Sequence, residues 1–191
     1  GGGGIDARPL WSATPIFHAI LGMPHDVPGW GAEWKAEIAH NFTRQMTLAS
    51  GTTSLAMDRN NITLDPNNTD QWGRPAIRAT YRDHDDDLAI ARFLSERSQE
   101  LMDAAGATKY WAHEIKPSEN GVHLLGTARM GDNPATSVID RYHRSHDVPN
   151  LFICDGSSFV TSGRGQPTMT IMALAFRAAE HIAAAAKANK I

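Results

Sequence analysis

The chain has 191 residues, of which 41% are hydrophobic, and a formal net charge of −3 at pH 7. This size and composition allow one or two domains with a hydrophobic core. Charges of both signs are interspersed, and we find no apolar run long enough for a bilayer and no N-terminal leader pattern, so the sequence favours neither nucleic-acid binding nor a membrane span in this chain. The single cysteine, Cys154, excludes an internal disulfide but leaves cytoplasmic and periplasmic locations open.

The first 117 residues predict helices mixed with antiparallel strands. We expect the four glycines at the start to be either a linker or the edge of a larger protein, and we favour the second. Periodicity predicts a short helix at 15–21, a helix at 31–42 and an extended segment at 43–57. It also predicts antiparallel strands at 61–64 and 76–81 around a loop at 70–73, a helix at 88–105 ended by Gly106, and a short strand within 107–115.

Residues 150–181 predict a strand, a turn, an irregular loop and a long helix in direct succession. The apolar run LFIC at 151–154 is typical of a strand buried on both faces, and Pro167 suits the first turn of the helix that follows it. In open α/β sheets, ligands bind beyond the carboxyl ends of the strands, where helix N-termini present free N–H groups. We therefore expect the chemistry in the loop at 155–168.

Two other clusters invite a metal-site interpretation. The acidic run at 83–87 lacks the glycine turn and the distal glutamate of a calcium loop, so we expect a solvated loop at a helix N-terminus. His143 and His146 have zinc-like spacing but no evident third ligand, so surface or hydrogen-bonding roles are expected. The sequence therefore predicts no metal site.

His123 lies in a glycine-rich run, GVHLLGTARMG at 121–131. A histidine flanked by apolar residues is commonly a satisfied structural group, but small neighbours allow a flat ligand to approach and imidazole can take a proton near neutral pH. A serine hydrolase built on Ser157 or Ser158 with His123 and Asp155 is an alternative, although the G-x-S-x-G elbow is absent. A non-catalytic binding or structural module is the other alternative.

Taken together, the motifs resemble the C-terminal part of the glucose-methanol-choline (GMC) flavoprotein oxidoreductases. The resemblance rests on H-x-x-G-T-x-R-M-G from His123, then SVID, NLFICDGS and QPTMT in that order, and more weakly on residues 61–81. The family's N-terminal G-x-G-x-x-G fingerprint is not in this sequence. The resemblance implies an α/β protein with an α+β substrate domain: an antiparallel-sheet substrate domain at 1–117 and the C-terminal part of a Rossmann-like FAD-binding domain at 118–191.

The resemblance also implies roles for individual residues. His123 matches the base that takes the proton of a substrate hydroxyl, while FAD accepts the hydride. Gln166 stands where the family usually has Asn or His as a second catalytic residue, and its extra methylene relative to Asn alters the geometry. Asp155 and Gly156 match the segment near the flavin ribityl and pyrophosphate groups, and Pro167 and Thr168 match the turn near the pyrimidine edge. Gln166 is also expected to contact the cofactor.

The implied substrate is an alcohol, a sugar or a sugar acid, and the implied partners are an N-terminal FAD-binding segment and a quinone or cytochrome as electron acceptor. The residues do not separate an oxidase from a dehydrogenase. Because the dinucleotide fingerprint is missing from the sequence, we expect the 191-residue chain alone to bind FAD weakly or not at all and to show no alcohol oxidation.

Overall fold

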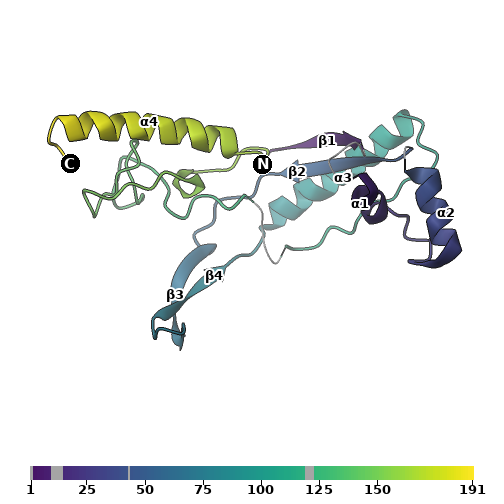
Figure 1. Ribbon diagram of the computed structural model, residues 1–191, viewed down its shortest axis with the longest axis horizontal. Helices are drawn as coiled ribbons and strands as arrows, with labels where there is room; N and C mark the ends of the chain where they lie inside the picture. Colours follow the sequence, from purple (N-terminus) through teal and green to yellow (C-terminus); the bar gives the residue numbers. More distant parts are fainter. Residues whose placement is uncertain (1, 10–14, 43, 119–122) are drawn as a thin grey trace. The chain divides into compact units, whose positions relative to one another are not determined.

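The computed structural model describes residues 2–9, 15–42, 44–118 and 123–191 (Figure 1). Their contacts divide the chain into two compact units, each made of two segments. One unit contains Thr53–Asp87 and Pro117–Ile191, and the other contains Gly2–Thr52 and Leu88–Lys116. The domain boundary expected at residues 117 and 118 stays a prediction.

The unit that contains Gly2–Thr52 is a two-stranded antiparallel sheet with helices. Strands β1 and β2 pair along their whole length, from Gly3 opposite Thr52 to Pro9 opposite Met46. The predicted helices are confirmed as α1 at Pro15–Leu21, α2 at Gly31–Asn41 and α3 at Asp85–Ala104. The predicted extended segment forms β2 over Met46–Thr52, and its partner β1 at Gly3–Pro9 was not predicted.

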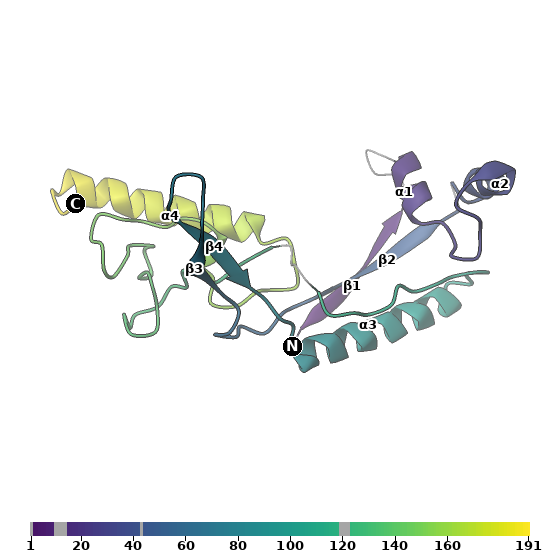
Figure 2. The same ribbon diagram turned by 90° about the horizontal axis from the view of Figure 1, so that it is seen from below.

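Helix α3 packs along this sheet (Figure 2). Leu94 is 9% exposed and lies close to Gly3. A Cβ atom added to Gly3 would lie 2.6 Å from the Leu94 Cδ1 atom and 2.9 Å from the Gly51 carbonyl oxygen, so a larger residue there would force its neighbours to shift. The Ser98 hydroxyl lies 3.1 Å from the Ser50 hydroxyl on β2. As predicted, α3 ends before Gly106, which has φ 76°.

The strand predicted within residues 107–115 is wrong. These residues form no strand, and side chains hold them instead: Lys109 forms an ion pair with Asp26, and the Tyr110 hydroxyl donates to Asp103. A short extended run becomes a strand only when its backbone groups pair with a neighbouring strand, and residues 107–115 pair with none of the described strands.

In the other unit, β3 (Asn61–Thr69) and β4 (Pro75–Thr80) form the predicted antiparallel hairpin. Strand β3 is longer than predicted, because it continues through Pro66 with an irregular register between Leu64 and Thr69. In the loop, the Asp70 carboxylate accepts from the backbone N–H groups of Trp72 and Arg74, both at 2.9 Å. Leu64 and Ile77 stand opposite each other and are 64% and 76% exposed.

The acidic run at residues 83–87, which leads into α3, is less solvated than expected. Asp87 is buried, and its carboxylate accepts from the backbone N–H groups of Leu55 and His84, both at 3.0 Å. Asp83 accepts from the Tyr81 hydroxyl at 2.7 Å and from the Ser118 N–H group at 2.6 Å. These carboxylates anchor neighbouring backbone segments at the start of the helix.

The strand predicted at residues 151–154 is also wrong. Phe152 makes only an isolated bridge with Arg144, and Leu151 is 45% exposed. A strand buried on both faces needs two neighbouring strands and covering layers, which the described residues do not form. The chain therefore shows small antiparallel sheets plus helices, while the Rossmann-like arrangement is not formed by the described residues.

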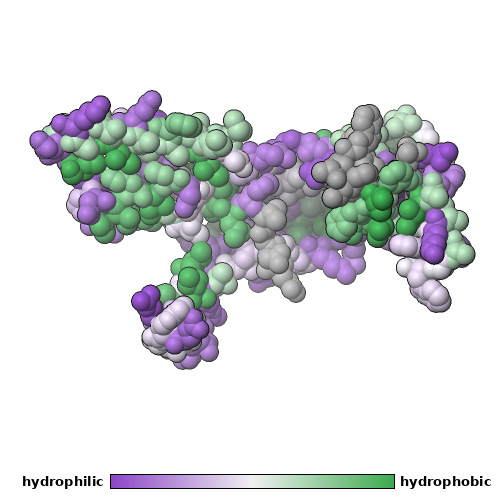
Figure 3. Space-filling view, viewed as in Figure 1, coloured by the Kyte–Doolittle hydropathy of each residue, from purple (hydrophilic) through white to green (hydrophobic). Residues whose placement is uncertain are grey.

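The predicted final helix is confirmed as α4 and extends over Thr168–Lys187. Ala178 is fully buried, whereas Met169 and Phe176 are 74% and 71% exposed, and apolar residues follow the helix in Figure 3. By length and composition alone α4 could cross a membrane, contrary to the expectation from sequence. Core helices of proteins outside membranes have the same length and apolar composition.

Candidate flavin-facing site

Backbone hydrogen bonds join the two motifs that sequence analysis singled out. The N–H groups of Gly126, Ala128 and Met130 donate to the carbonyl groups of Gly156, Ser157 and Ser158, at 3.4, 3.0 and 2.9 Å respectively. The segment that follows His123 therefore runs beside the turn that follows Asp155. Residues about 30 positions apart in the sequence become neighbours through these bonds.

Asp155 caps this turn, a 3₁₀ helix at Gly156–Ser158. Its carboxylate accepts from the Ser157 hydroxyl at 2.5 Å and from the Ser157 N–H group at 2.8 Å. The hydroxyl contact, followed by the backbone contact, holds the pKa of Asp155 below its ordinary value, because both stabilise the ionised form. These contacts fix the backbone of the turn. The Asp155 side chain itself is exposed and stays accessible.

Gly156 is the point of closest packing in the turn. A Cβ atom at this position would lie 2.7 Å from the Cδ2 atom of Leu125 and 3.2 Å from the Cδ1 atom of Ile171. Gly156 thus allows the loop after His123 and the first turns of α4 to meet at one place. Ser158 beside it is fully buried, and its hydroxyl donates to the Asp155 carbonyl at 2.8 Å.

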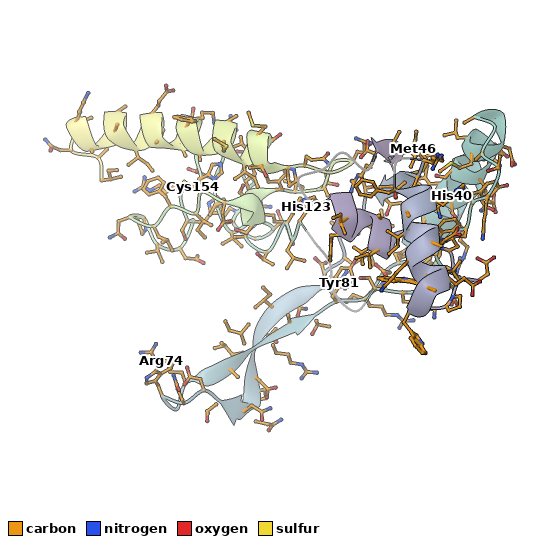
Figure 4. All side chains as sticks on the ribbon, turned by 45° about the vertical axis from the view of Figure 1, so that its right-hand side comes forward. His40, Met46, Arg74, Tyr81, His123 and Cys154 are labelled. Atoms are coloured by element: carbon orange, nitrogen blue, oxygen red, sulfur yellow. The ribbon has the colours of Figure 1, made fainter. Side chains whose placement is uncertain are left out.

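His123 and Gln166, the two predicted catalytic residues, are exposed and have positive φ angles. His123 has φ 59° and Gln166 has φ 41°, values that side chains other than glycine adopt rarely and that often mark functional sites. His123, labelled in Figure 4, lies two residues before Leu125, which packs at Gly156. Among the described residues, no hydrogen bond joins His123 to Gln166.

Pro167 and Thr168 form the start of α4. Pro167 takes helical φ and ψ angles, and no side chain of the described residues caps the helix there. The first intrahelical bond is donated by Ile171 to the Pro167 carbonyl. The N–H groups of the first turn are therefore available to an anionic ligand, in the direction of the helix dipole.

These features fit one side of a flavin. Exposed donors at the α4 N-terminus suit the negative charge that a reduced flavin carries. Gly126, with φ 87°, packs against the neighbouring backbone: a Cβ atom there would lie 3.2 Å from the Phe159 carbonyl oxygen. The residues that would hold the flavin are Asp155, Gly156, Gln166, Pro167 and Thr168. The chain contains no G-x-G-x-x-G turn for the pyrophosphate.

His143 is a component of this region that the sequence did not reveal. It is 1% exposed, and its Nδ1 atom lies 2.7 Å from the Ile153 carbonyl. Of the surface or hydrogen-bonding roles expected for His143 and His146, the hydrogen-bonding role is confirmed for both, since the His146 Nε2 atom lies 2.9 Å from the Ser137 hydroxyl. The burial of His143 is what the sequence did not indicate. Nothing in the residue pattern RYHRSHD distinguishes the buried histidine from the other.

Comparison with known proteins identifies the family. The GMC oxidoreductase profile matches residues 56–175, which is more than half of the chain and includes both paired motifs. The chain therefore belongs to the GMC oxidoreductase family.

Three relatives match at least four fifths of this chain. They are the 2-methyl-1,2-propanediol dehydrogenase of Mycolicibacterium austroafricanum (38% identity over 82% of this chain and 28% of the relative), the gluconate 2-dehydrogenase flavoprotein of Pantoea cypripedii (28%, 94% and 31%) and the fructose dehydrogenase large subunit of Gluconobacter japonicus (30%, 80% and 28%). The chain thus spans only 28% to 31% of the length of these relatives.

The contact between Asp155 and Ser157 has a measurable consequence. The folded-state pKa of Asp155 lies below its unfolded value of about 3.9. Ionised Asp155 therefore stabilises the folded state above that pH, and this stabilisation is lost as the pH falls through the folded pKa. We expect Ser157→Ala to raise the pKa of Asp155 part of the way toward its ordinary value, since the backbone N–H contact remains. Titration of the Asp155 carboxyl carbon by NMR measures this.

Ser162→Ala is the matched control, because Ser162 has no described contact with Asp155. An Asp155 pKa that stays unchanged in Ser157→Ala would contradict the assignment of the hydroxyl as the main cause of the shift.

Proposed function

We propose that this chain forms the substrate-facing and isoalloxazine-facing part of a flavin-dependent oxidoreductase that oxidises the CH–OH group of an alcohol, sugar or sugar acid. The observation that carries the proposal is the set of three backbone bonds that fixes the segment after His123 against the turn at Asp155. Family membership and the flavoprotein name of one relative support FAD as the cofactor. When bound, FAD supplies the hydride acceptor that no side chain can provide.

His123 is proposed as the general base. Oxidation of an alcohol removes a proton from oxygen and a hydride from carbon, and an imidazole can take the proton. Its exposure leaves the ring free to meet a substrate hydroxyl, while the pairing at 126–130 restricts where its backbone can be. General acid–base catalysis by a positioned side chain accelerates a reaction by about 10² to 10⁴.

Gln166 is proposed to orient the same hydroxyl. Its amide offers a donor and an acceptor, and its position directly before Pro167 fixes it at the start of α4. The left-handed backbone at Gln166 suits Asn better than Gln, so the longer side chain is tolerated at a conformational cost. Such a cost is expected where the amide of the side chain is needed to bind the substrate hydroxyl.

The helix start and Asp155 are proposed to hold the cofactor. The N–H groups of the first turn of α4, which begins at Thr168, stabilise negative charge. The fixed backbone at Asp155 and Gly156 provides a rigid surface for contact with the cofactor. Names of relatives support an alcohol or sugar as substrate, and the names flavoprotein and large subunit support assembly with further chains that carry electrons onward. A quinone or cytochrome acceptor belongs to the proposal.

The proposed base is tested by His123→Ala in the intact protein. We expect the variant to retain flavin and to reduce it with substrate about 10² to 10⁴ times more slowly, because the proton acceptor is lost. Anaerobic stopped-flow measurement of flavin bleaching gives the rate. His40→Ala is the control, because His40 lies on α2 and belongs to no proposed site. A His123→Ala variant that bleaches at the normal rate would refute the assignment.

The amide of Gln166 is tested by a pair of substitutions. Gln166→Asn keeps the amide and suits the left-handed backbone, whereas Gln166→Leu removes every hydrogen-bonding atom. We expect Gln166→Leu to lower the rate of flavin reduction at least about tenfold more than Gln166→Asn, the worth of one hydrogen bond to a reacting group. An equal loss of the rate of flavin reduction in the two variants would show that the amide of Gln166 has no role in orienting the hydroxyl.

A further inference from the structure

The imidazole of His143 forms a cross-link to the segment that leads into Asp155. The Nδ1 atom lies 2.7 Å from the Ile153 carbonyl, and a carbonyl oxygen only accepts, so Nδ1 carries the proton and donates. In return, the Ile153 N–H group donates to the His143 carbonyl at 3.0 Å. Ile153 is thus held on both its polar backbone atoms, two residues before Asp155. Figure 4 labels Cys154, which lies between them.

Packing alone does not explain a histidine at this position. The side chain is 1% exposed, and its Nε2 atom is buried without a hydrogen-bond partner among the described residues. Leaving a buried polar atom unpaired is unfavourable, and an apolar side chain would fill the space without that penalty. The feature that only the polar ring supplies here is the bond from Nδ1 to Ile153.

A closed turn holds the ring in place. His143 has φ 69°. The Asp140 carboxylate accepts from the backbone N–H groups of Tyr142 and Arg144, at 2.7 and 3.0 Å. The Asp140 N–H group in turn donates to the Arg144 carbonyl at 2.8 Å. The Tyr142 ring stacks on His181 of α4 with 4.0 Å between the ring centroids. The turn therefore contacts both the segment before Asp155 and the final helix.

We propose that His143 is a positioning residue for the flavin-facing loop: its Nδ1–H group fixes Ile153 and thereby sets where Asp155 and Gly156 lie. This role rests on the proposed function, because it assigns the loop to the flavin. His143 itself touches neither substrate nor cofactor in this account. It acts through the backbone, so its loss is expected to alter the flavin environment without removing a reacting group.

The test compares two substitutions that both accept a positive φ angle, in the full-length flavin-loaded protein. His143→Asn keeps a donor near the Nδ1 position, whereas His143→Gly keeps the backbone conformation and removes the donor. Two measurements are made: amide hydrogen exchange of residues 151–158, and the visible spectrum and midpoint potential of the flavin. Should His143→Gly fail to fold, His143→Asp replaces it, because it matches Asn in shape but cannot donate when ionised.

We expect the variant without the donor to exchange amides at 151–158 roughly 5 to 10 times faster, the factor that corresponds to one hydrogen bond, and to shift the flavin spectrum and potential. His143→Asn is expected to stay close to the natural protein in both measurements. Identical behaviour of the two variants, or unchanged exchange in both, would overturn the proposal. Faster exchange with an unaltered flavin would refute the flavin-facing role of the loop, and with it the proposed function, while leaving the cross-link to Ile153 in place.

Discussion

The backbone pairing between residues 126–130 and 156–158 is the constraint on which the site depends. The three bonds bring together a loop that carries an exposed histidine and a turn whose aspartate is fixed by its own serine. Neither segment is part of a helix or strand longer than a single 3₁₀ turn, so their shape comes from these bonds and from the turn at Asp140. Gly156 is the position that lets both segments and α4 approach one another.

Hydrophobic burial contributes little to this arrangement among the described residues. The buried apolar residues of the whole described chain are Ala19, Leu94, Ile139 and Ala178, and the apolar side chains Met169 and Phe176 of α4 and Leu64 and Ile77 of the β3–β4 hairpin are exposed. Hydrogen bonds to backbone groups and buried polar side chains, such as Ser158 and Asp87, therefore define the local geometry more than a core does. This is consistent with a site that is held by loops.

Sequence patterns predicted the regular elements well and the site in part. Helix α3, the β3–β4 hairpin and α4 follow from periodicity and turn residues, because their signals are local. The strand at 151–154 failed because its apolar run needs neighbours that local pattern cannot show. The motifs pointed to His123, Asp155 and Gln166, but the contact of His143 with Ile153 is made across a turn, and no spacing rule reveals it.

The central claim is that the paired motifs place His123 and Gln166 at the reactive edge of a flavin. A crystal structure of the full-length protein with FAD and a substrate analogue tests this claim most directly. The account predicts that the His123 and Gln166 side chains both lie within hydrogen-bond reach of the substrate hydroxyl beside flavin N5, and that the start of α4 faces the pyrimidine edge. A flavin whose N5 lies away from His123, with the 126–130 and 156–158 pairing intact, would contradict it.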